Sequence, residues 1–154
     1  MEDVKNIYLT FAASGNKYGV CIDKVVEILE YTEPKSKSAN LPYLIGLTEH
    51  RDNVIPLIDT GLKFGLSAVE ITPRTCTLVI SINAGGSTFD VALAVDEVSD
   101  VIEVEDSAKQ NIETNYKPGY VMYAIKHGAE LILALNVDKI FTDTDIVSLK
   151  QILK

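Results

Sequence analysis

The sequence predicts an all-β fold, either a sandwich or a barrel, with few helices. Short apolar runs separated by turn residues recur along most of the chain, and helical spacing is confined to two short segments. The chain also runs twice through a hairpin, a polar loop and an apolar strand, an order that suits two small barrels sharing a core. With 154 residues, 47% of them hydrophobic, the chain is long enough for one domain with a buried core.

The N-terminal part is predicted to form a hairpin followed by a short helix. Residues 6–13 and 17–22 are apolar runs joined by Ser-Gly-Asn, which is typical of a hairpin. In residues 23–31 the apolar side chains have helical spacing, and Asp23 stands where an N-cap residue belongs. We therefore expect a helix of about two turns there.

A loop and a proline-containing strand are expected next. Residues 32–40 are polar and aperiodic, which indicates an exposed loop. Residues 53–59 (NVIPLID) form a strand candidate that contains Pro56. Because proline cannot donate a hydrogen bond to a β-ladder, Pro56 indicates a sheet edge, a bulge or a strand end.

The remaining elements are predicted from alternation and turn signals. Further strands are expected at residues 74–82, 87–96, 98–105, 120–127 and 130–137. Residues 143–154 are amphipathic and predict a C-terminal helix that Asp143 or Asp145 could cap. We expect a single domain over residues 1–154, with a first barrel at 14–82 and a second at 83–141, into which the N-terminal strand could be exchanged.

Charge and the chain start limit the classes of partner. The 14 basic and 22 acidic residues give a net charge of −8, and the basic residues are scattered, which disfavours nucleic acid and anionic membranes. The acidic N-terminus does not resemble a signal peptide, and no apolar run could span a bilayer, so we expect a cytoplasmic protein without membrane insertion. Cys21 and Cys76 are expected to be buried, reduced thiols.

No pattern of catalytic or metal-binding residues is present. His50 and His127 are the only histidines, and neither has ligand spacing to a second His or Cys. The nucleotide-binding glycine motifs and the nucleophile elbow are absent, and the acidic residues of 96–105 alternate with apolar ones as on a solvated strand face. We expect no enzyme, no cofactor and no metal.

One short stretch, HRDNVIPLID, gathers charged residues around an apolar run. His50, Arg51, Asp52 and Asp59 could form a catalytic cluster, a structural turn or a docking surface. Arg51 could make a surface ion pair of little energetic value, or it could be a partly buried anchor that binds a carboxylate with both arms of its guanidinium. The residues alone leave these alternatives open.

The order of several stretches resembles the chemotaxis coupling protein family, the CheW-type adaptors. The resemblance rests on FAASGNKYGVCIDKVVEIL, LPYLIGLTEHRDNVIPLIDTGLKFGL, VALAVDEVSDVIEVE and ELILALNVDKIF, in this order between Tyr8 and Phe141. Gly46, Arg51, Pro56 and Asp59 match the family pattern at the right spacing. Glu49 and His50 replace its Asn-Leu, and Asp52 replaces the glycine after Arg51, at a position that often needs positive φ.

The resemblance implies a non-catalytic, cytoplasmic adaptor. The fold would be two five-stranded barrels, SH3-like or OB-like, and the partners would be the cytoplasmic tips of chemoreceptors and the regulatory domain of the chemotaxis histidine kinase. Carried over by position, the receptor-facing residues are Val25, Glu27, Gly46 and Arg51. We hypothesise that Glu27 and Arg51 pair across the groove between the barrels beside Val25, with Pro56 and Asp59 holding Arg51 in place.

The kinase-facing residues are less explicit in the sequence. The family uses apolar strand edges and loops, and the imperfect alternation of residues 98–105 could turn some of its apolar residues outward, although most are expected in the core. These residues are Val98, Val101, Ile102 and Val104, of which Val98, Ile102 and Val104 are the predicted kinase-facing residues.

Three alternatives remain: a CheW-like scaffold of a different signalling array, an OB-like oligonucleotide-binding module, and a small enzyme with a carboxylate site. The oligonucleotide-binding module predicts basic and aromatic residues on one barrel face.

Overall fold

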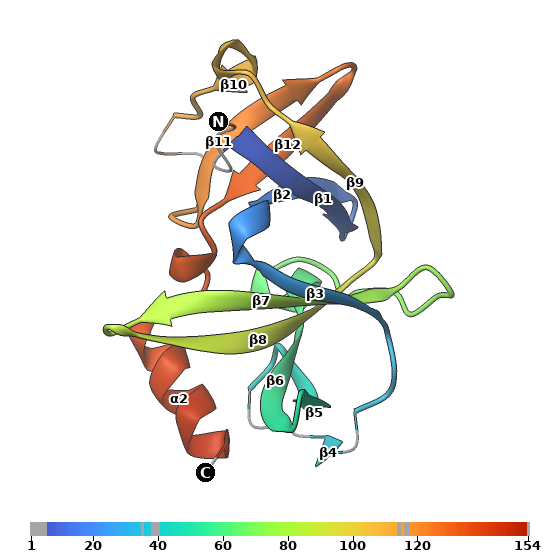
Figure 1. Ribbon diagram of the computed structural model, residues 1–154, viewed down its shortest axis with the longest axis vertical. Coiled ribbons are helices and arrows are strands. Elements are labelled where there is room, and N and C mark those ends of the chain that lie inside the picture. The colour runs from blue at the N-terminus through green and yellow to red at the C-terminus, as the bar shows by residue number, and fades with distance from the viewer. Residues whose placement is uncertain (1–5, 35, 38–40, 114, 116–117, 154) are drawn as a thin grey trace.

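Two six-stranded β-sheets share one hydrophobic core. The computed structural model describes residues 6–34, 36–37, 41–113, 115 and 118–153. In Figure 1 one sheet lies above the other, and the C-terminal helix lies beside the lower one.

Each sheet contains five longer strands and one strand of two residues. Sheet A contains, in spatial order, β10 (Lys109–Gln110), β11 (Val121–His127), β12 (Glu130–Leu135), β2 (Asn16–Cys21), β1 (Ile7–Ala13) and β9 (Glu97–Glu103). Sheet B contains β3 (Val25–Glu30), β7 (Cys76–Ala84), β8 (Ser87–Val95), β6 (Asn53–Asp59), β5 (Leu44–His50) and β4 (Ser36–Lys37). The helical elements are η2 (Ile22–Lys24), α1 (Thr60–Lys63), η3 (Asp106–Ala108), η5 (Val137–Lys139) and α2 (Asp143–Leu153).

The predicted all-β class is confirmed, but the described backbone forms two open sheets and no closed barrel. Sheet A ends in β10 and β9, and sheet B ends in β3 and β4. Each sheet is mixed, because β12 runs parallel to β2 and β6 runs parallel to β8. These two parallel pairings join segments that are distant in sequence.

The sheets divide the chain differently from the predicted boundaries at 14–82 and 83–141. The β1–β2 hairpin joins β9 to β12 in sheet A, so β2 lies outside the sheet that the first range was meant to form. Strand β8 pairs along its whole length with β7 in sheet B, although the boundary separates the two. A tight turn at Gly85 and Gly86 keeps β7 and β8 together, since both glycines have positive φ.

The helix predicted at residues 23–31 is wrong. The chain makes only the short η2 turn and then enters β3, which pairs with β7. Adjacent residues of a strand point to opposite faces, so Val25 packs against the shared core and Val26 packs on the other face of sheet B. A bulge between Val25 and Glu27 then puts Glu27 opposite Val79, on the same side as Val26. Both faces of β3 thus carry apolar residues, and the resulting pattern imitates helical spacing.

The loop predicted at residues 32–40 is interrupted by the short strand β4, which pairs with β5. Residues 35 and 38–40 of that prediction lie outside the described residues. The two cysteines, predicted to be buried and reduced, form no disulfide within the described residues, and both are only half-buried.

Three apolar clusters hold the fold together. The largest lies between the sheets and includes Leu9 and Phe11 of sheet A with Leu78 and Ile80 of sheet B, all at most 2% exposed. A second cluster lies on the other face of sheet A around Ile132, and a third lies on the other face of sheet B. The third consists of Ile55, Leu57, Val79, Ala92 and Ala94.

Helix α2 is fixed at its first turn by a reciprocal cap. The Asp145 backbone N–H donates to the Thr142 hydroxyl at 3.1 Å, and the Thr142 N–H donates to the Asp145 carboxylate at 2.9 Å. The Tyr43 hydroxyl also donates to Asp145 at 2.7 Å, which ties the helix to the start of β5. Ile146 and Leu149 then complete the shared core.

We predict that Asp145→Ala lowers the free energy of unfolding by about 1 to 2 kcal/mol, because it removes the cap and leaves Tyr43 without its acceptor. Burial alone would raise the pKa of this carboxyl, but hydrogen bonds from Thr142 and Tyr43 and the charge of Lys63 outweigh it, so the pKa lies below its usual value. The stability that ionised Asp145 contributes is therefore complete above the ordinary pKa of an aspartate. It is lost as the pH falls through the lower pKa that Asp145 has in the folded protein.

Denaturant unfolding from neutral to acid pH measures this effect. Asp143→Ala is the matched control, since Asp143 lies in the same helical turn but is exposed. Equal losses in both variants would contradict the role of the cap.

Candidate functional site

Sheet B curls so that its edge strand β3 meets β5, although three strands lie between them in the order of the sheet. Val26 of β3 and Ile45 of β5 pack against the same buried cluster. A side-chain bond crosses the same gap, because His50 Nε2 lies 2.6 Å from Glu27 Oε2. Side chains, not a backbone ladder, therefore bring the two strands together.

The register explains why Glu27 and His50 face each other. Glu27 lies opposite Val79 on β7, and Thr48, two residues before His50, lies opposite Ile55 on β6. Val79 and Ile55 both belong to the cluster inside the curl, so alternation turns Glu27 and His50 toward that side.

His50 is the buried partner of this pair. Its side chain is 5% exposed, whereas that of Glu27 is 37% exposed. The carboxylate can only accept, so the imidazole N–H donates to Glu27. A buried ring nitrogen without this acceptor would carry a desolvation penalty, so the pair stabilises the closed sheet.

The β5–β6 hairpin carries Arg51 at its tip. Arg51 and Asp52 form the two-residue loop with φ of 50° and 66°, as in a type I′ turn, and His50 pairs with Asn53 beneath them. The Arg51 side chain is exposed, and no hydrogen bond or ion pair joins its guanidinium to the described residues. The turn thus presents an unpaired cation directly beside the buried His50.

The hypothesis that Glu27 pairs with Arg51 is wrong in this structure, because His50 holds Glu27. Of the four predicted receptor-facing residues, only Glu27 and Arg51 come together, through the intervening His50. Val25 lies on the opposite face of β3 and packs against the shared core, and Gly46 is buried in β5 opposite Leu57. From the sequence, His50 is considered as a member of a catalytic cluster, as a metal ligand and as a departure from the family pattern, but not as the partner of Glu27; strand alternation from Thr48 is the signal that it points inward.

Pro56 lies where β6 has a partner on one side only. It pairs with Leu47 of β5, and the parallel pairing with β8 begins one residue later, at Leu57. A residue without an N–H is tolerated at such a position. Pro56 also lies next to the Leu44/Gly46 irregularity of β5, in keeping with the predicted edge or bulge.

Asp59 lies at the far end of β6 from Arg51, so the expectation that it holds Arg51 in place is not supported. Its buried carboxylate accepts hydrogen bonds from the N–H groups of Leu62 at 3.0 Å and Val69 at 3.1 Å. It therefore caps α1 and fixes the connection between β6 and β7.

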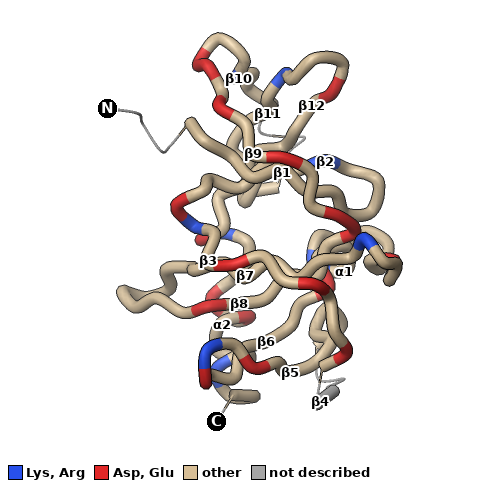
Figure 2. The backbone as a smooth tube through the Cα atoms, turned by 45° about the vertical axis from the view of Figure 1, so that its right-hand side comes forward, with Lys and Arg blue, Asp and Glu red and all other residues tan. Residues whose placement is uncertain are grey.

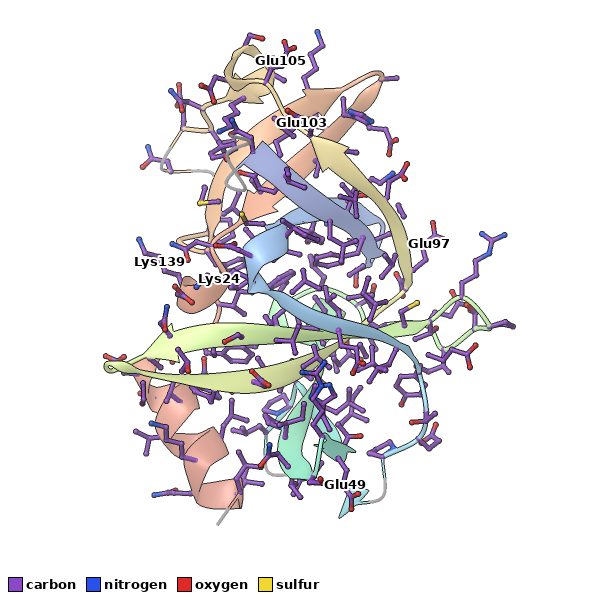
Figure 3. The ribbon with its side chains drawn as sticks, viewed as in Figure 1. Lys24, Glu49, Glu97, Glu103, Glu105 and Lys139 are labelled. Atoms are coloured by element: carbon purple, nitrogen blue, oxygen red, sulfur yellow. The ribbon has the colours of Figure 1, made fainter. Side chains whose placement is uncertain are left out.

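Strand β9 forms one edge of sheet A and carries the predicted kinase-facing residues. Val98 is half-buried against the shared core, and Ile102 and Val104 pack in the cluster on the other face of sheet A. The outward apolar residue is Val101, which is 55% exposed. Glu97, Glu103 and Glu105 follow the same edge in Figure 3, and such charges protect an edge strand from unwanted pairing.

A pocket with a volume of about 360 Å³ lies beside sheet A. Tyr8, Cys21, Met122 and Tyr123 line it, with Lys109 at 5.2 Å from the centre of the Tyr123 ring. Burial raises the pKa of the Tyr8 hydroxyl and of the Cys21 thiol, so both are protonated at neutral pH. These groups do not form an activated nucleophile.

Further observations limit the kinds of site that the described residues can form. Within the described residues no group of three or more His, Cys, Asp and Glu side chains could hold a metal ion, and no helix there is long and apolar enough to cross a membrane. Acidic positions are spread over both sheets in Figure 2, and each phenylalanine is buried or half-buried. A basic surface with exposed aromatic rings, as single-stranded nucleic acid requires, is not formed by these residues.

Together these features define a two-sheet β-domain whose exposed hairpin carries a charged tip. Residues 8–145 match the family model described as CheW-like domain, and the chain belongs to this family. The chain is 28% identical over 163 residues to the chemotaxis protein CheW of Klebsiella aerogenes, covering 99% of this chain and 92% of the relative. It is 29% identical over 99 residues to the chemotaxis protein CheW of Bacillus subtilis, a match that covers 64% of this chain and 61% of the relative.

A solved structure supports the fold. The scaffolding protein TtCheW from Thermoanaerobacter tengcongensis superposes with a TM-score of 0.76 at 19% identity, covering 89% of this chain and 92% of that one.

We predict that Asp52→Gly raises the free energy of unfolding by about 0.5 to 1 kcal/mol, because glycine adopts positive φ without the cost that a side chain incurs. Asp52→Ala should lower it, since alanine tolerates this conformation less well than aspartate. Chemical denaturation of the two variants measures both effects. A destabilised glycine variant would show that the Asp52 side chain makes a stabilising contact in the turn.

Proposed function

We propose that this protein is a non-catalytic, cytoplasmic adaptor that couples chemoreceptors to the chemotaxis histidine kinase. The match to the CheW-like domain over residues 8–145 carries the proposal. Relatives with the same domain are chemotaxis proteins, and TtCheW is a scaffolding protein. The cavity residues described above, which lack an activated nucleophile, agree with a role in binding.

The receptor-facing surface is centred on Arg51. Its guanidinium can bind a carboxylate with two parallel hydrogen bonds, and the backbone of the tight turn limits its freedom. Val54, which follows the turn in β6, is 51% exposed and offers an apolar contact beside the charge. Val25 and Gly46 support this surface from within the sheet, and Glu27 borders it. An apolar contact with a charged rim suits the tip of a helical hairpin.

The kinase-facing surface is placed on the β9 edge of sheet A. Packing holds strand β9 and the residue that follows it in place through Val98, Ile102 and Val104. Val101 of the same strand is exposed and supplies the apolar contact. A surface on sheet A leaves the Arg51 turn of sheet B accessible, so the two partners could bind together, as coupling requires.

Co-sedimentation with receptor signalling fragments and kinase tests the proposal. The wild-type protein should join the assembly, and Arg51→Glu should reduce receptor binding by about tenfold or more, because it replaces a favourable charge contact with a repulsive one. Arg74→Glu is the matched control, since Arg74 is the only other arginine and its side chain is 81% exposed.

Two results would contradict the proposal. If the wild-type protein stays in the supernatant with both partners, the coupling function is wrong. If Arg51→Glu sediments like Arg74→Glu, the receptor-facing surface lies elsewhere.

A further inference from the structure

At the tip of sheet B a histidine holds a carboxylate, and the next residue in the chain is an arginine. His50 donates to Glu27 across 2.6 Å, and Arg51, the next residue in the chain, has an exposed guanidinium without a partner among the described residues. Arginine carries a full charge and a flexible side chain, so it could compete for Glu27 if His50 did not hold it. In the structure the Glu27 carboxylate is bonded to His50 and not to Arg51.

His50 holds Glu27 at a low entropic cost. Its ring is buried and fixed by the surrounding strands, whereas Arg51 would have to immobilise a long, exposed side chain to make the same contact. Burial also strengthens the hydrogen bond from His50 to Glu27, because the ring lies in a region of lower dielectric constant than water.

We propose that His50 is a specificity-determining residue of the turn: by binding Glu27 it leaves the Arg51 guanidinium available to an acidic side chain of the partner. The identity of that partner rests on the proposed function, but the competition for Glu27 concerns this chain alone. His50 acts through Arg51 and does not itself need to touch the partner.

The surrounding charges define the kind of partner. Arg51 is the only Lys or Arg between residues 44 and 59, and the exposed Asp52 follows it in the turn. A broadly acidic surface would be repelled by the Asp52 carboxylate. An apolar helical surface carrying one isolated Asp or Glu would place that acid on Arg51 and its apolar side chains on Val54.

The first experiment needs no partner. The chain has two arginines, so the two Nε–Hε signals in a ¹⁵N-correlated NMR spectrum can be assigned with Arg51→Lys and Arg74→Lys. In His50→Leu the Arg51 signal should shift and exchange more slowly with water, because Glu27 is released to it. Glu27→Gln added to His50→Leu should return the signal to its wild-type position. An unchanged Arg51 signal in His50→Leu would overturn the proposal.

The second experiment measures binding to a receptor signalling fragment. His50→Leu should weaken binding about tenfold, roughly the value of one charge-assisted hydrogen bond, and Glu27→Gln in the same protein should restore it. A purely structural role for His50 would not be rescued by changing Glu27, so a persistent loss in the double variant would contradict the proposal. Absence of binding by the wild-type protein would contradict the proposed function while leaving the NMR result valid.

Two further variants keep the tests decisive. His50→Gln retains a side-chain donor for Glu27 and should resemble the wild type in both experiments. If His50→Leu does not fold, His50→Ala makes the same comparison, because it also removes the donor. A shift of the Arg51 signal in His50→Gln as large as in His50→Leu would contradict the role of the hydrogen bond.

Discussion

The apolar core between the two sheets is the constraint on which the rest of the structure depends. Strand β1 is buried on both faces, with Leu9 and Phe11 toward sheet B and Tyr8 toward the other side of sheet A. Neither sheet could bury its inner face alone, so their association is part of folding and not a later docking step. At one end of this core Phe64, beyond α1, stacks on Tyr120 with ring centres 4.6 Å apart, which ties the β6–β7 connection to sheet A.

The charged turn follows from the way sheet B closes. Its backbone ladder ends at β3 on one side and at β4 on the other, so β3 and β5 can meet only through side chains. Val26 and Ile45 make the apolar part of this contact, and Glu27 and His50 make the polar part. The hydrogen bond between Glu27 and His50 therefore has two effects. It completes the curled sheet, and in our proposal it keeps Glu27 from neutralising the positive charge of the adjacent Arg51.

Local pattern was enough to predict most strands and the C-terminal helix. Alternating residues bounded by Gly85 and Gly86 located β8, and the spacing of residues 143–154 located α2. The helix predicted at residues 23–31 is wrong because Val25 and Val26 pack on opposite faces of strand β3 and a bulge puts Glu27 on the side of Val26, and one sequence reveals neither arrangement. The places of β2 beside β12 and of β8 beside β6 could not be read from local pattern, because these parallel pairs join segments that are distant in sequence.

The candidate site was predicted only in part for the same reason. The family resemblance selected Arg51 and Glu27 but paired them with each other, whereas the acceptor of the His50 bond lies 23 residues away in sequence. Val25 and Gly46 were placed in the site by position, and their burial could not be read from residue type. The turn was easier to anticipate, since Asp52 replaces a glycine where positive φ is required, and the structure has φ of 66° there.

A double-mutant cycle on unfolding free energy tests the central claim most directly. Glu27→Gln, His50→Leu and the double variant should give a coupling free energy of about 1 to 3 kcal/mol between the two side chains. The same cycle with Glu30→Gln, an exposed glutamate three residues further along β3, should give a value near zero. If the Glu27 cycle also gives a value near zero, His50 does not hold Glu27 in solution. The claims that this bond closes sheet B and leaves Arg51 available to a partner are then wrong.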